Sequence, residues 1–432
     1  MTNQWSKRVA AVICAGAILL TASTAWGEWG DGVRGGPFLL QPGVTLSAGF
    51  DSNLYYQSGS AVDRLHQSPE GTLEPRLSLQ TVEGGSWDLS GQASVKWRQY
   101  FSDDAIVRNQ SGMSAALDGT AKWNADGPVS LEFSENFVRS NETPSLPSDQ
   151  ALNRIYNRAG VMAGLHPGGQ IMQTYGSYDW ALYRHNLHPD IDRDIHHFGW
   201  HFNWSFLPQT AFTLEVDYRR IRYSEPFRFT GGEEGGIRNV NSNPLRLWAG
   251  LSGLIFPRVT VIVSGGYGWG RYEEGPDVAS FQARSQVSYQ FGNMDYNNRL
   301  RLGYEYGFAD STLGNFFTRH RIIAGYEQGF LANRLRLSAD VSGDGRQYAE
   351  LESATVEVNG RSVSLPSDPS DVLLGVSASA NYTIRNGWTA GVRYGFRSNL
   401  TDDEVVIQGM DSDSVLRDYQ RHNMMFTTTL TY

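Results

Sequence analysis

Apolar and polar residues alternate with a period of two along most of this chain. In residues 87–98 the odd positions, from Trp87 to Trp97, are apolar or small, and the even positions, from Asp88 to Arg98, are polar. The same alternation recurs in residues 197–206, 281–291, 300–308, 335–341, 372–382 and 388–396. Because successive side chains of a strand point to opposite faces, each segment predicts a strand with one apolar and one wet face.

Aromatic residues lie at the ends of these apolar faces, as Trp87 and Trp97 do, and the polar faces carry charges. A soluble barrel or sandwich would turn its charged faces to solvent and its aromatic ones to a dry core. A transmembrane barrel instead places aromatic rings at the two membrane interfaces and charged side chains in a wet lumen. The pattern therefore favours an all-β, antiparallel, up-and-down transmembrane β-barrel, whose closure leaves no strand edge unpaired in hydrocarbon.

Links between the strands alternate between short and long. Short links rich in Gly, Pro and Asn, as tight turns require, occur at 83–85, 124–128, 166–170, 207–210, 256–258, 332–333 and 384–387, and long polar links occur at 57–69, 139–152, 185–195, 224–243, 345–370 and 398–421. This asymmetry is typical of periplasmic turns and external loops. Counting the strands between these links predicts about 18, with about 16 as the nearest alternative. An even number is expected because it returns both termini to the same side.

The N-terminus has the pattern of a cleaved signal peptide over residues 1–27. Lys7 and Arg8 precede an apolar run over residues 9–20, and the small residues Ala25 and Gly27 occupy the positions expected before a cleavage site. The run is too short for a spanning helix, which needs about 20 residues. Residues 28–432 are expected to form a single barrel domain. The only cysteine, Cys14, lies in the cleaved segment, so neither disulfides nor cysteine-based metal sites are expected.

The last strand, residues 424–432, alternates up to a terminal aromatic residue. Phe426, Leu430 and Tyr432 lie on its lipid-facing side. This segment resembles the terminal-aromatic signature of bacterial outer-membrane β-barrel proteins, and the mature chain as a whole resembles porins. More loosely, its size is similar to that of the barrels that accompany polysaccharide export. The resemblance implies an outer-membrane location, contact with outer-membrane lipids and lipopolysaccharide, and recognition by the barrel assembly machinery. The looser similarity to export barrels implies a periplasmic export lipoprotein as a partner.

Little in the sequence indicates a catalytic, cofactor-binding or metal-binding site. The net charge of -9 argues against a nucleic-acid partner. No nucleophile motif or phosphate-binding glycine loop occurs, so neither an enzyme nor a cofactor is expected. One cluster of imidazoles could bind a metal, but three of its members are expected in a polar external loop and two in the lumen, so no metal site is predicted. The cluster comprises His185, His188 and His196 in the loop, and His197 and His201 in the lumen.

The alternation also predicts which charges line the lumen. The candidates are Lys96, Arg98, Arg219, Arg246, Arg284, Arg301, Glu305, Arg336, Asp340 and Arg393. The arginines either favour anionic solutes or simply pair with lumen acids. The first functional hypothesis is a passage for polysaccharide export. A small-solute porin is the second, although the lumen offers only Trp248 towards an aromatic sugar track. The third is a closed structural barrel in a secretion or motility complex.

Overall fold

The computed structural model describes most of the chain. The described residues are 30–54, 67–82, 85–140, 154–166, 171–185, 192–224, 240–292, 296, 298–311, 315–349, 355–358, 361–364, 370–400, 405–406, 415–416 and 419–432. The predicted signal peptide, Cys14 and His188 lie outside them. Within these ranges, no helix combines the length and the hydropathy that crossing a membrane requires.

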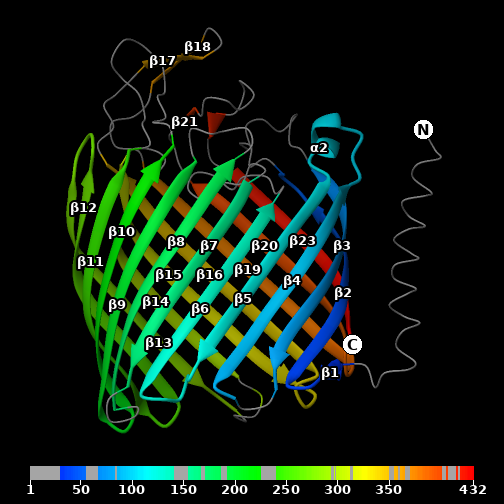
Figure 1. The fold of residues 1–432 in the computed structure, drawn as a ribbon. Helices are drawn as coiled ribbons and strands as arrows, with labels where there is room; N and C mark the ends of the chain where they lie inside the picture. Colours follow the sequence, from blue (N-terminus) through cyan, green and yellow to red (C-terminus); the bar gives the residue numbers. More distant parts are fainter. Residues whose placement is uncertain are drawn as a thin grey trace.

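The main sheet is a closed antiparallel barrel (Figure 1). It has 19 strands, of which β1 (Val33–Gly35) pairs only with β2, so 18 form the wall. These are β2 (Phe38–Asp51), β3 (Ser68–Thr81), β4 (Trp87–Tyr100), β5 (Gly112–Trp123), β6 (Val129–Ser140), β7 (Arg154–Leu165), β8 (Met172–His185), β9 (Arg193–Leu207), β10 (Thr210–Tyr223), β11 (Ser242–Phe256), β12 (Val259–Tyr272), β13 (Val278–Gln290), β14 (Arg299–Asp310), β15 (Phe316–Phe330), β16 (Leu335–Tyr348), β19 (Ser370–Arg385), β20 (Trp388–Leu400) and β23 (Tyr419–Thr431).

Each wall strand pairs with the next one along the chain, and the first and last strands close the ring. The closing pair joins residues 43–51 of β2 to residues 423–431 of β23. The predicted fold and the predicted count of 18 are confirmed. The smaller elements of the described chain are α2 (Ala105–Asn109) and two short hairpins, β17 (Thr355–Val358) with β18 (Arg361–Ser364) and β21 (Val405–Val406) with β22 (Val415–Leu416).

The links differ at the two ends of the barrel. The C-terminus and the tight turns, such as those at 208–209, 257–258 and 386–387, lie at the lower end in Figure 1, and α2 lies at the upper end. The upper links include the long ranges 224–241, 349–369 and 401–418. Two upper links depart from the expected alternation, because 273–277 and 311–315 are short. They flank β13 and β14, where the wall itself is also irregular.

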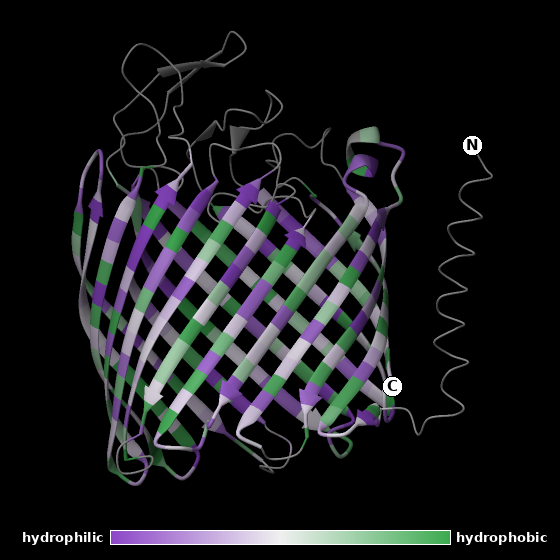
Figure 2. Cartoon of the chain, in the orientation of Figure 1, coloured by the Kyte–Doolittle hydropathy of each residue, from purple (hydrophilic) through white to green (hydrophobic). Residues whose placement is uncertain are grey.

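The two faces of the wall differ in polarity, and Figure 2 shows hydrophobic and hydrophilic residues alternating along the strands. On the outer face, Val95 is 40% exposed and Phe426 is 56% exposed. Exposed apolar side chains that surround the whole barrel are expected where the surrounding solvent is lipid rather than water. At the last strand, Leu430 lies opposite Val44 and Trp388 in the pairing register, and the Tyr432 amide donates to the Pro42 carbonyl at 2.9 Å. The assembly role of this strand stays a prediction.

Candidate functional site

Contacts between strands that are not neighbours identify the lumen face. Arg284 of β13 donates to Glu215 of β10 at 2.6 Å, and Arg301 of β14 donates to Asp340 of β16 at 2.9 Å. On the convex outer surface, side chains of such strands diverge, so contacts across an intervening strand require both side chains to point inward. These four residues therefore face the lumen.

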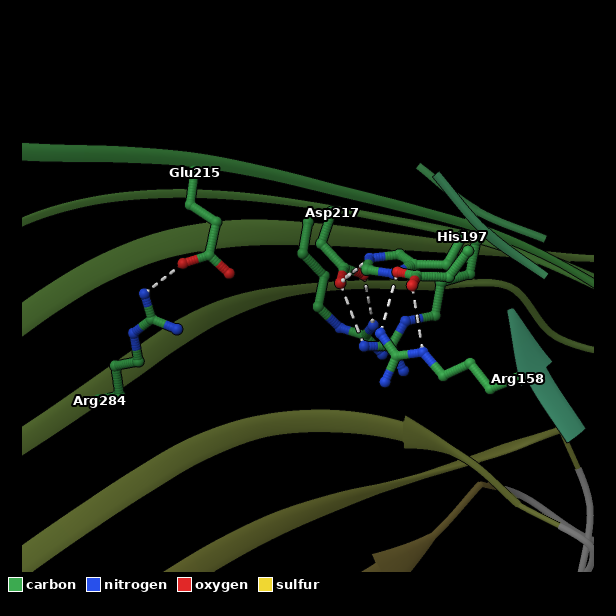
Figure 3. Close-up of polar contacts among 8 residues, drawn as sticks. Arg158, His197, Glu215, Asp217 and Arg284 are labelled. Carbon is green, nitrogen blue, oxygen red and sulfur yellow. Dashed lines mark hydrogen bonds and ion pairs between the residues drawn. The ribbon is translucent and has the colours of Figure 1, made fainter. Parts of the chain in front are cut away.

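A chain of opposite charges crosses the upper part of this face, from β7 to β11 (Figure 3). Arg158 donates to both oxygens of Asp179, at 3.3 and 2.9 Å. The His197 ring lies between two carboxylates, with Nδ1 3.0 Å from Asp179 Oδ2 and Nε2 2.9 Å from Asp217 Oδ2. An ionised carboxylate only accepts hydrogen bonds, so both ring nitrogens donate and the imidazole is a cation in this arrangement.

Asp217 is the central acid of this chain and is only 9% exposed. Besides His197, it accepts from Arg219 at 3.1 Å and from Arg246 at 3.5 Å. Cations that lie close together repel one another, and the ionised carboxylate of Asp217 between them offsets this repulsion. The arrangement therefore fixes the position of three cationic side chains on the wall.

Further arginine–carboxylate pairs continue along the wall beyond β11. They are Arg284 with Glu215, Arg319 with Glu305 at 3.1 Å, Arg299 with Glu327 at 3.1 Å and Arg301 with Asp340. Several guanidiniums of this wall also cover aromatic rings. Arg284 lies 4.7 Å from the Trp248 ring centroid, Arg246 lies 4.6 Å from that of Phe308, and Arg193 lies 4.6 Å from that of Tyr183. The face that Trp248 would offer to a sugar is thus occupied by a guanidinium.

The upper end of β14 turns away from β13 into the lumen. The pairing of these strands stops at Ala283 and Tyr306, whereas β14 continues beside β15 to Asp310. Asp310 accepts from Ser242 Oγ at 3.1 Å and from Tyr272 Oη at 2.9 Å, which lie on β11 and β12.

Phe308 is carried inward with this end of β14 and is 4% exposed. Its even number would place it on the outer face of β14, because even and odd residues of a strand point to opposite faces. Arg246 also donates to its carbonyl at 3.2 Å. A Cβ at Gly268 or Gly270 would come within 2.7 or 3.1 Å of the Phe308 ring, so the two glycines make room for it. The wall is thickened here by its own strands.

The opposite wall is the inner face of β20, β23, β2 and β3, which we call the seam wall because β2 and β23 close the barrel there. Arg421 binds Asp51, which is 1% exposed, through both carboxylate oxygens. Lower down, Thr45 and Thr429 share a hydrogen bond of 2.9 Å, and Arg76 of β3 donates to the Thr431 hydroxyl at 2.8 Å. Two exposed arginines of β20, Arg393 and Arg397, have no carboxylate partner among the described residues.

The structure brings some of the lumen candidates together and keeps others apart. Arg219 and Arg246 share Asp217, and Arg301 and Asp340 bind each other. The others have separate partners or positions: Arg284 with Glu215, Glu305 with Arg319, Arg98 with Glu70 at 3.3 Å, Arg336 with Asn333 at 2.9 Å, Lys96 within β4 and Arg393 within β20. Sequence reasoning did not single out Asp179 and His197 as partners, although both have the parity of the polar face.

The histidine cluster is arranged differently from the prediction. His185 ends β8 and contacts Asp192 at 3.1 Å, while His196 lies within β9, on the outer face beside Tyr178, rather than in a loop. His196 and His197 therefore point to opposite sides of the wall, because they are consecutive residues of a strand. In the described part of the chain, no three His, Cys, Asp or Glu side chains are grouped as a metal would need.

No family model matches the chain, and neither does any curated protein. Among solved structures, it is similar to a BenF-like porin from Pseudomonas fluorescens Pf-5, with 11% identity, a TM-score of 0.49 and coverage of 91% of this chain and 99% of that one. It is also similar to OccAB3 of Acinetobacter baumannii, with 10% identity, a TM-score of 0.47 and coverage of 91% and 99%. A third structure, OpdK of Pseudomonas aeruginosa with vanillate, has 11% identity, a TM-score of 0.45 and coverage of 91% and 99%. No function or substrate of this chain follows from these similarities.

Proposed function

We propose that this chain is a channel of the bacterial outer membrane through which small solutes diffuse, with a preference for anions. A closed barrel with an apolar exterior and a charged interior is suited to carry polar solutes across a bilayer. The observation that carries the preference is the uneven pairing of lumen charges. Carboxylates hold several arginines of the β7–β16 wall, among them Arg158, Arg219, Arg284 and Arg301. In contrast, Arg393 and Arg397 face the lumen with no carboxylate partner among the described residues.

Small solutes fit the wall better than a polysaccharide does. A sugar polymer is expected to slide over uncovered aromatic rings, but guanidiniums lie over Trp248, Phe308 and Tyr183. The inward turn of β14 also narrows the lumen on one side. An array of fixed guanidiniums instead offers hydrogen bonds and positive charge to small anions.

Single-channel recording in planar bilayers tests this function. We expect a stable conductance, and a reversal potential under a KCl gradient that shows chloride to be more permeant than potassium. In the Arg393→Gln/Arg397→Gln variant, the reversal potential should shift towards cation preference. Arg271→Gln is the matched control, because Arg271 has the parity of the outer face of β12, and it should behave as the unmodified protein.

The alternatives give different results. A closed structural barrel would show no conductance. A polysaccharide conduit would require loss of surface polysaccharide after deletion of the gene, whereas the small-solute channel predicts unchanged polymer. A cation-selective pore would contradict the proposed preference and leave the channel itself standing.

A further inference from the structure

The outer face of β6 carries a carboxylate in the middle of the lipid-facing band. Glu135 is the seventh residue of β6, and it shares its face with Val129 and Phe133, which are 42% and 45% exposed. Among the described residues, no hydrogen-bond donor or cation contacts it. Other outward charges, such as Arg139 and Arg184, lie within the last two residues of their strands, at the upper rim.

A carboxylate at this depth is unfavourable in contact with lipid. Charged residues on the lipid face of a barrel are destabilising, basic ones more than acidic ones, and the cost is largest at the midplane and falls towards the interfaces. Ionisable groups inside the hydrocarbon therefore usually have a protein partner. Since the described wall supplies none, we look for the partner of Glu135 outside this barrel.

The residues beside Glu135 are small and leave room for an approaching surface. The pairing register places Gly91, Gly119, Glu135 and Ala159 in one row across β4, β5, β6 and β7. Larger residues form the rows on either side, with Leu117 and Phe137 in one and Phe133 and Val161 in the other. Small residues at membrane interfaces let two backbones approach closely.

The same surface also carries an amide. Asn157 lies opposite Phe137 in the register, one row from Glu135 and on the same outer face. A face that holds both a carboxyl and an amide is complementary to a copy of itself, because the amide of one copy can donate to the carboxyl of the other. In such a contact, Phe133 and Phe137 of one copy would pack on the row of small residues of the other copy. Symmetric self-association is the commonest form of assembly among soluble oligomers.

We propose that a second copy of this chain docks on the outer face of β4–β7, hereafter the Glu135 face, with Glu135 hydrogen-bonded across the contact. This proposal concerns the outside of the wall and is independent of what the lumen carries. It also explains why a carboxylate is tolerated in the lipid-facing band. The second copy shields Glu135 from lipid chains and gives it a polar partner.

Mass measurement in mild detergent, by size-exclusion chromatography with light scattering, tests the proposal. We expect the unmodified protein to be oligomeric, and Glu135→Leu and Ala159→Phe to be monomeric. Glu135→Gln should remain oligomeric because it keeps the hydrogen-bonding group. Ala249→Leu is the control, since Ala249 is a small exposed residue on the outer face of β11, and it should not change the mass. Heat-modifiable gel mobility shows that each variant has folded.

Cross-linking in native outer membranes tests the same contact in the absence of detergent. In a Cys14→Ser background the chain has no cysteine, because Cys14 is the only one. Ala159→Cys should then give a covalent dimer on oxidation, and Ala249→Cys should not. A monomeric unmodified protein with no cross-link at Ala159 overturns the proposal. So does a Glu135→Leu variant that keeps the oligomer.

Discussion

The two halves of the lumen wall are lined by different kinds of polar side chain. From β7 to β11 the wall carries long charged side chains that bind one another, with Asp217 contacting three cations. Half-way round the barrel, the middle of the seam wall carries hydroxyl groups such as those of Thr45 and Thr429. Its ion pair between Asp51 and Arg421 lies higher, and lower down Arg76 binds the Thr431 hydroxyl instead of a carboxylate.

This difference shows that the strand pairing alone does not set the shape of the lumen. Every neighbouring pair of wall strands is hydrogen-bonded, but the contacts across intervening strands differ. From β10 to β16 they include arginine–carboxylate pairs, whereas in the seam wall Arg76 donates to the Thr431 hydroxyl and the Asn423 amide donates to Glu70. Long paired side chains project into the lumen, whereas short hydroxyls stay near the backbone. The inward end of β14 adds a further layer to the charged wall, so we expect the passage to be narrowed from that side.

Asp217→Ala is expected to have the largest effect on stability. The variant leaves His197, Arg219 and Arg246 beside one another without their shared carboxylate. Removing one member of a buried ion pair costs about 3–5 kcal/mol. Because lumen water screens the remaining charges in part, we expect a loss of about 3 kcal/mol in the free energy of unfolding by urea in detergent micelles.

The control for Asp217→Ala is on the seam wall. Thr429→Val removes one hydroxyl hydrogen bond and keeps the shape of the side chain, so the loss should be about 1 kcal/mol or less. Equal losses in the two variants would show that the charged network contributes no more than a single hydroxyl pair, and would remove the distinction between the walls.

His197→Gln is expected to have a smaller effect. Glutamine can donate to one carboxylate but does not replace a cation between two, so Asp179 and Asp217 would repel each other across the strand between them. We expect a loss of about 1–2 kcal/mol in the same unfolding measurement, in the range of a hydrogen bond to a charged group. His201→Gln, on the same face of β9, is the matched control. An unchanged stability in His197→Gln would mean that the imidazole does not bridge the two acids.

The sequence predicted the wall well and its interior only in part. Period-two alternation and link lengths determine strands, faces and closure, because a strand side chain has only two directions to choose from. The alternation placed Arg219 and Arg246 on the lumen face, but it could not show that both reach Asp217. Such pairing depends on the register and on side-chain reach across the curved wall, which no single strand encodes.

Phe308 shows the limit of the alternation more directly. Its parity predicts the outer face, yet it is buried inside against Arg246. The reason is that β14 leaves β13 above Tyr306, so the direction of a side chain no longer follows from the position of its neighbours. The glycines at 268 and 270, which make room for the ring, are the one trace of this arrangement in the sequence.

The smallest expected effect is a change in conductance that compares the two walls. Phe308→Ala removes a ring from the inward end of β14, where the wall is thickened, and should raise the single-channel conductance modestly. Met425→Ala shortens an apolar side chain on the lumen side of β23, where no strand turns inward, and should change the conductance less. Since both variants delete apolar atoms only, ion selectivity should stay the same in each. A larger rise in Met425→Ala than in Phe308→Ala would place the narrow part of the passage at the seam wall instead, because conductance responds most to the narrowest section.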